Sequence, residues 1–134
     1  MKVLVADDDE AIRSLVTHLF HRRGDLTTAV NDGEAAIARL DQEDFDLLVL
    51  DLMMPRVDGL GVLAHLAARS TRSPQIIVMT AAIPSLAAEV PRDQVTAVVT
   101  KPFEIAALMR IADDVVRGKA PTDSTPIPPV MDPA

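Results

Sequence analysis

Cysteine is absent from this chain of 134 residues. Its absence excludes disulfide bonds, a thiolate nucleophile and cysteine ligation of a metal. Tryptophan and tyrosine are absent too, so the chain lacks two of the residue types that usually dominate binding hot spots. No apolar run approaches the roughly 20 residues that a membrane-spanning helix needs. We expect no contact with the membrane, and the first residues show no signal peptide, which favours the cytoplasm.

Positive charge is scarce. The chain carries 13 Lys and Arg residues against 20 Asp and Glu residues, a formal net charge of −7. A nucleic-acid-binding surface would need a basic patch or stripe, and the densest positive cluster, His21-Arg22-Arg23, is too short to form one. We therefore expect no direct contact with nucleic acid. The length suits one domain, and the apolar and charged fractions are those of an ordinary globular protein.

Short apolar runs of strand length alternate with runs of helical periodicity. The predicted strands are 3–6, 26–30, 47–51, 75–79 and 95–99. The predicted helices run from 12 to about 24, from a capping box of Asn31 and Glu34 onward, from 59 to about 69, over 85–90, and from 103 onward. This β-α repetition predicts an α/β, flavodoxin-like (βα)5 three-layer sandwich, with a five-stranded parallel sheet in the order 2-1-3-4-5.

The composition changes near the C-terminus. Prolines and small polar residues dominate 118–134, and this segment has no hydrophobic periodicity. Such a segment cannot build a core. The sequence therefore predicts one domain over 1–117, followed by a proline-rich disordered tail or linker over 118–134.

Charged and hydroxyl side chains stand where four of the predicted strands end. In chain order they are Asp7 and Asp8, then Asp51, Thr80 and Lys101. The carboxyl ends of parallel strands meet at one edge of a sheet, where α/β proteins bind their ligands, so we expect these groups to converge. Crowded carboxylates repel one another, and a bound cation relieves the repulsion. The acidic side chains offer only oxygen atoms as ligands, and oxygen ligands suit a hard cation. We therefore expect the bound ion to be Mg²⁺.

Asp51 could act as a nucleophile and form an acyl-phosphate. A transferred phosphoryl group then needs charge neutralisation and positioning more than covalent help. Mg²⁺ would take one phosphoryl oxygen, the Lys101 ammonium a second and the Thr80 hydroxyl a third. These residue types together fit aspartyl phosphorylation.

At these residues the chain resembles the receiver (response-regulator) domain of bacterial two-component signal transduction. The resemblance covers residues 1 to about 117. It rests on four sequence motifs, which in chain order are Ala-Asp7-Asp8-Asp-Glu-Ala-Ile-Arg13, Asp51-Leu-Met-Met-Pro55-Arg-Val-Asp-Gly59, Thr80-Ala81 and Lys101-Pro102-Phe103. Each motif alone is weak evidence for the family, but the four motifs together, each at the end of a predicted strand, are specific to it.

The resemblance implies a phosphoryl-accepting signalling switch. Asp51 would take the phosphoryl group from a phosphohistidine of a histidine kinase or phosphotransfer protein. Asp8 would bind Mg²⁺ directly and Asp7 mainly through water, with Asp51 and the Met53 backbone carbonyl completing the protein ligands. Such a domain is not a conventional enzyme, because it catalyses only its own phosphorylation and a slow dephosphorylation.

The resemblance also implies a switch region made of Thr80, Val98 and Pro102. Thr80 and Lys101 would contact the phosphoryl group. The family usually has an aromatic residue three positions before the lysine, where this chain has Val98. Output would pass to an unknown downstream protein through the face formed by the 85–90 helix, the fifth strand and the last helix. The domain would act as a monomer or as a phosphorylation-dependent dimer.

Other interpretations stay open. The chain could be a receiver fragment of a longer regulator or hybrid kinase. A carboxylate-nucleophile phosphatase would need a second acid two residues after the nucleophile, where Met53 stands. A flavodoxin-like cofactor binder would need phosphate-cradling residues after the first strand and aromatic side chains to cover the cofactor. Acids follow that strand instead, and aromatic side chains are nearly absent from the chain.

Overall fold

Five parallel strands form the centre of the fold. The structure is a computed structural model that describes residues 1–69, 72–81, 88–101 and 105–118. The strands are β1 (Lys2–Ala6), β2 (Leu26–Val30), β3 (Leu47–Asp51), β4 (Gln75–Ala81) and β5 (Ala97–Lys101). They lie in the order β2-β1-β3-β4-β5, and every neighbouring pair is parallel. The predicted α/β fold and its strand order are therefore confirmed.

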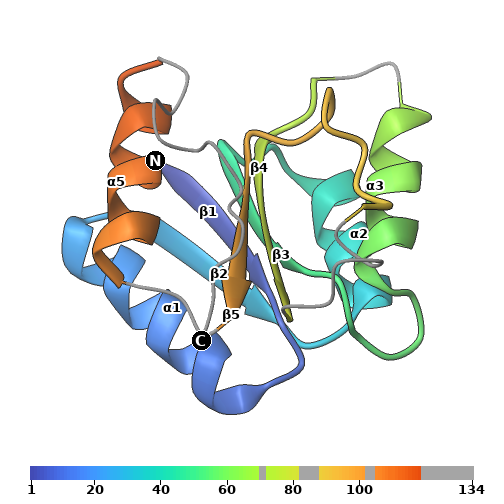
Figure 1. Cartoon of the computed structure of the whole chain (residues 1–134), viewed down its shortest axis with the longest axis horizontal. Helices are drawn as coiled ribbons and strands as arrows, with labels where there is room; N and C mark the ends of the chain where they lie inside the picture. The colour runs from blue at the N-terminus through green and yellow to red at the C-terminus, as the bar shows by residue number, and fades with distance from the viewer. Residues whose placement is uncertain (70–71, 82–87, 102–104, 119–134) are drawn as a thin grey trace.

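Helices cover both faces of the sheet. They are α1 (Glu10–Arg23), α2 (Gly33–Gln42), α3 (Gly59–Ala67) and α5 (Ile105–Val116). α1 and α5 lie on one face, and α2 and α3 lie on the other (Figure 1). Among the described residues, no helix combines the length and apolar character needed to cross a membrane. Residues 85–87 of the helix predicted over 85–90 fall outside the described residues, as do Pro102 and the tail over 119–134, while 88–90 form a turn and a bend instead of helix.

Each face of the sheet buries its own hydrophobic cluster, because successive side chains of a strand point to opposite faces. The buried strand residues that pack toward α1 and α5 are Val3, Val5, Leu47, Val49, Ile77, Met79 and Ala97. Those that pack toward α2 and α3 are Leu4, Ala6, Leu48, Leu50, Ile76, Val78 and Val98. A strand covered on both sides must be apolar at consecutive positions, which is the pattern from which the parallel sheet was predicted.

Two strands end further along the chain than the sequence predicted, and β5 also begins two residues later than the predicted 95–99. β4 continues to Ala81, and β5 begins at Ala97 and includes Lys101. The two strands remain paired to their ends, where Ala81 lies opposite Lys101. The polar side chains of Thr80 and Thr100 do not end these strands, because the ladder is made by backbone groups and does not depend on side-chain polarity.

The predicted cap of α2 was wrong by one residue. Asp32, not Asn31, precedes the helix with an extended backbone, and its Oδ1 accepts a hydrogen bond from the Ala35 amide at 2.7 Å. Asp9 caps α1 and Asp58 caps α3 in the same way. Asparagine and aspartate are equally good N-cap residues, so the sequence offered two adjacent candidates.

Gly59 lets α3 start directly against the end of β3. Its amide donates to the Leu52 carbonyl at 2.9 Å. A Cβ at this position would lie 2.5 Å from the Asp51 carbonyl oxygen and 2.6 Å from Leu52 Cα. Both are backbone atoms, so a larger residue would push α3 away from the strand that carries Asp51.

We expect Gly59→Ala to lower the free energy of unfolding by roughly 2–3 kcal/mol, because backbone atoms must move to admit the methyl group. Gly61→Ala is the matched control within the same helix. Its methyl group would meet the Val57 side chain at 2.7 Å, while the helix gains about 1 kcal/mol of propensity. Urea denaturation compares the two, and equal losses of stability would contradict this account.

Candidate functional site

Three carboxylates meet at the C-terminal edge of the sheet. Asp7, Asp8 and Asp51 each place one oxygen within 4.8 Å of the others. Asp7 and Asp51 are buried, whereas Asp8 is exposed. The pairing of β1 with β3 explains why Asp7 and Asp51 lie close together. Ala6 of β1 pairs with Leu50 of β3, and the next residue along the chain is an aspartate in both cases. The sequence prediction that these acids converge is borne out by the structure.

Lys101 brings a positive charge into this cluster from β5. Its Nζ donates to Asp7 Oδ2 at 2.9 Å and lies 3.5 Å from Asp51 Oδ2. Burial alone would lower the pKa of the Lys101 ammonium, but the hydrogen bond to Asp7 and the charges of Asp51 and Asp7 outweigh it and raise the pKa. Lys101 is therefore a permanent positive charge beside three acids, and the cluster as a whole remains negative.

Asp7 is fixed by contacts on several sides. Its Oδ1 accepts from the Asp9 amide at 2.9 Å, while Oδ2 accepts from Lys101. Its backbone carbonyl accepts from Arg13 Nη1 at 2.9 Å, and its amide donates to the Val30 carbonyl at 3.2 Å. Sequence reasoning assigned Arg13 no role. The spacing of six residues between Asp7 and Arg13 carries no recognisable signal for this contact.

The environment of Asp51 opposes its ionisation. Burial raises the pKa of Asp51 to about 7, and the negative charge of Asp7 adds to this, while Lys101 and the hydrogen bond from the Met53 amide act in the opposite direction. The Met53 amide donates to Asp51 Oδ1 at 3.2 Å. A divalent cation would supply the missing countercharge. A cluster of carboxylate oxygens with unbalanced negative charge fits a hard ion such as Mg²⁺.

The structure describes three of the four other residues that were singled out in the sequence. Thr80 is fully buried, and its Oγ1 donates to the Ala81 carbonyl at 3.2 Å. Met53 is 54% exposed. Val98 is buried in the hydrophobic cluster on the α2–α3 face. Pro102 belongs to the residues that are not described.

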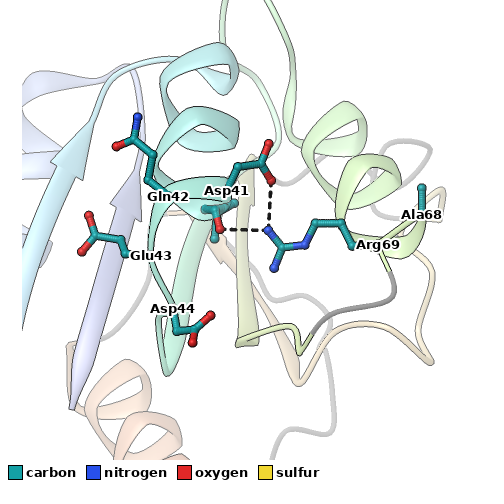
Figure 2. A pocket seen from close by; sticks show the side chains of 7 residues that line it. Asp41, Gln42, Glu43, Asp44, Ala68 and Arg69 are labelled. Carbon is teal, nitrogen blue, oxygen red and sulfur yellow. Dashed lines mark hydrogen bonds and ion pairs between the residues drawn. The ribbon is translucent and has the colours of Figure 1, made fainter.

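A separate hollow of about 580 Å³ lies between the C-terminal ends of α2 and α3. Figure 2 shows Arg69 reaching across it toward Asp41. Arg69 Nη1 donates to Asp41 Oδ1 at 3.1 Å and to the Leu40 carbonyl at 2.9 Å. Because α2 begins at the edge of the sheet that holds the acids, its C-terminal end is at the opposite edge. These contacts tie two helix ends together and take no part in the acidic site.

Comparison with known proteins identifies the family. The family model described as the response regulator receiver domain matches residues 3–113, so the chain belongs to this family. The chain is 32% identical over 116 residues to the transcriptional regulatory protein TrcR of Mycobacterium tuberculosis, covering 81% of this chain and 42% of TrcR. It is 40% identical over 80 residues to the transcriptional regulatory protein CpxR of Klebsiella pneumoniae, covering 60% of this chain and 33% of CpxR. The chain thus matches less than half the length of either relative.

Solved structures of receiver domains match almost from end to end. The receiver domain of the Francisella response regulator 1452 has a TM-score of 0.77 and 32% identity, covering 88% of this chain and 98% of that one. The chemotaxis response regulator CheY4 of Vibrio cholerae has a TM-score of 0.76 and 27% identity, covering 85% and 97%. The general function of receiver domains is that of a phosphoryl-accepting signalling switch, and they are not conventional enzymes.

The raised pKa of Asp51 predicts how stability depends on pH. The native carboxyl holds its proton to about pH 7, whereas the ordinary value is 3.8, so the native state binds more protons between these limits. The free energy of unfolding of the cation-free protein should therefore fall as the pH rises from about 4 to about 7. Asp51→Asn is neutral at every pH. It should remove most of this fall and stabilise the protein at pH 8 by roughly 1–4 kcal/mol.

Urea unfolding in the presence of a chelator, at several pH values between 4 and 8, measures this effect. Asp44→Asn is the control, because Asp44 is exposed and lies at the far edge of the sheet beside the α2–α3 hollow. It should leave the pH profile of the wild-type protein unchanged. A profile for Asp51→Asn that falls as steeply as that of the wild type would show that Asp51 is not the group responsible.

Proposed function

We propose that Asp51 accepts a phosphoryl group from the phosphohistidine of a histidine kinase or phosphotransfer protein. The observation that carries this proposal is the cluster of Asp7, Asp8, Asp51 and Lys101 at the C-terminal edge of the sheet. Membership of the receiver family supplies the class of reaction. The cluster supports the assignment of this reaction to Asp51 and its neighbours. It places a buried carboxylate nucleophile beside the positive charge of Lys101 and beside acids that could hold a cation, and a transferred phosphoryl group requires such positive charges.

In the proposed step, an oxygen of Asp51 attacks phosphorus. An O–P bond forms, the P–N bond to histidine breaks, and the histidine nitrogen leaves with the bonding electrons. Asp51 Oδ1 is held by the Met53 amide, whereas Oδ2 lies 3.5 Å from Lys101 Nζ. Oδ2 is therefore the oxygen that would attack, and Lys101 would neutralise charge on the phosphoryl oxygens.

Asp7, Asp8, Asp51 and the backbone carbonyl of Met53 would hold Mg²⁺. When bound, this ion supplies positive charge that favours ionised Asp51 and offsets the charge of the phosphoryl group. Both carboxylate oxygens of Asp7 already accept hydrogen bonds, from the Asp9 amide and from Lys101. These bonds support a contact of Asp7 with the ion through water, which leaves the direct role to exposed Asp8.

Output is proposed to pass to another protein through the face that includes β5 and α5, in a monomer or in a phosphorylation-dependent dimer. Thr80 would exchange its bond to the Ala81 carbonyl for one to the phosphoryl group. Val98 is already packed in the hydrophobic core, so a rotating aromatic side chain cannot transmit the change here. A shift of β4 against β5 would take its place. The same switch would serve a stand-alone receiver or the receiver part of a longer regulator or hybrid kinase.

Incubation with acetyl phosphate and Mg²⁺ should add one phosphoryl group, measured by intact mass, and peptide mapping should place it on Asp51. The reaction should require Mg²⁺ and should be lost when a chelator is present, because the negative cluster would otherwise repel the phosphodonor. Asp51→Ala should remain unmodified, while Asp44→Ala should react like the wild-type protein. No reaction of the wild type, or phosphorylation of Asp51→Ala, would overturn the proposed function.

Phosphorylated Asp51 should lose its phosphoryl group slowly, over minutes or longer. Met53 stands two residues after the acceptor and is 54% exposed, and its thioether is too weak an acceptor to orient an attacking water. Ala82, two residues after Thr80, is equally apolar but lies outside the described residues. Met53→Asn should shorten the lifetime several-fold and Met53→Leu should leave it unchanged, as followed by intact mass. A wild-type lifetime of seconds would contradict this prediction.

A further inference from the structure

The loop between β3 and α3, residues 52–58, packs directly against the N-terminal end of α2. The contact is close because α2 begins with a glycine. A Cβ on Gly33 would lie 1.8 Å from the Val57 carbonyl oxygen and 2.6 Å from its carbonyl carbon. This loop contains Met53, whose amide contacts Asp51 and whose carbonyl is a proposed ligand of Mg²⁺. The packing of the loop on α2 therefore bears on the geometry of the site.

Asp32 connects the loop to the helix. Its Oδ1 accepts from the Ala35 amide at 2.7 Å and caps α2, while its Oδ2 accepts from Arg56 Nε at 2.9 Å. The side chain of Asp32 is only 11% exposed, whereas the side chain of Arg56 is 62% exposed. The carboxylate is thus fixed by the helix that it caps. The hydrogen bond from Arg56 to Asp32 therefore links the 52–58 loop to the N-terminal end of α2.

Arg56 has an unfavourable backbone conformation. Its φ of +69° is the only positive value for a non-glycine residue in the described parts of the chain. The Val57 amide donates to the Pro55 carbonyl at 2.9 Å across Arg56. A positive φ closed by a hydrogen bond between residues i and i+2 is the rare and strained form of the γ-turn. A conformation of this kind persists only where surrounding contacts enforce it.

We propose that Arg56, held by Asp32, is a positioning residue that sets the backbone of Met53 in the phosphorylation site. Met53 precedes Arg56 by three residues in the same loop. The start of the loop is fixed by the Leu52 carbonyl, which accepts from the Gly59 amide, and the Asp32–Arg56 pair fixes the strained turn. Without this pair the turn relaxes toward negative φ, and the Met53 amide and carbonyl move with it. This inference rests on the proposed function.

Two substitutions each remove one charge of the Asp32–Arg56 ion pair. Asp32→Asn keeps an oxygen that can cap α2, and Arg56→Gln replaces the guanidinium with a shorter, uncharged amide. Each should weaken Mg²⁺ binding, measured by titration calorimetry, and slow phosphorylation by acetyl phosphate, both by roughly 3- to 10-fold. The double variant should be no worse than either single variant, because both remove the same interaction. Arg56→Lys keeps the charge and should recover most of the affinity.

Arg72→Gln is the matched control. Arg72 pairs with Asp46 at 3.4 Å, and its side chain is 68% exposed, close to the value for Arg56. Asp46 directly precedes β3, so the pair lies at the opposite edge of the sheet from the acids. Arg72→Gln and Arg56→Gln should change the melting temperature to a similar small extent, and only Arg56→Gln should change the affinity for Mg²⁺.

The outcomes separate the two proposals. If the wild-type domain binds Mg²⁺ and is phosphorylated, but Asp32→Asn and Arg56→Gln do both equally well, Arg56 has no positioning role. An equal loss of Mg²⁺ affinity in Arg72→Gln would also overturn the inference, because a general loss of stability would then explain the effect. A wild-type domain that neither binds Mg²⁺ nor accepts a phosphoryl group would overturn the proposed function and, with it, this inference.

Discussion

The structure depends on negative charge held close together out of water. Asp7 and Asp51 are buried side by side, and Lys101 supplies a single positive charge between them. Burying like charges is costly unless hydrogen bonds and countercharges compensate. Here the amides of Asp9 and Met53 donate to these carboxylates, yet the pKa of Asp51 is still raised to about 7. The fold therefore maintains an unbalanced site, and a bound cation would complete it.

The arrangement of the fold divides the site into rigid and adjustable parts. β3 and β5 end in charged residues and Asp7 directly follows β1, while the two hydrophobic clusters hold these strands in register. The loops that follow the strands supply backbone amides instead. Substitutions can therefore change the backbone donors in the loops without moving the carboxylates that the strands hold in place. A loop substitution can thus alter ion binding while the sheet remains intact.

Much of this site could be predicted from the sequence, because strand ends are local features. Asp51 ends an apolar run and Lys101 follows one, and a parallel sheet must bring such ends together. The contacts of Arg13 with Asp7 and of Arg56 with Asp32 could not be predicted. Each depends on how a helix or a loop packs, and the second joins residues 24 positions apart. The cap of α2 was missed for a different reason, since two adjacent residues suited it equally well.

β5 is an edge strand, and Lys101 at its end is the cation of the acidic site. A protein that binds beside β5 and displaces it even slightly must change the distance between Lys101 and the two buried aspartates. The free energy of that binding is then linked to the charge state of the site. Linkage is reciprocal, so such a partner would alter the affinity for a cation by the same factor as the cation alters affinity for the partner.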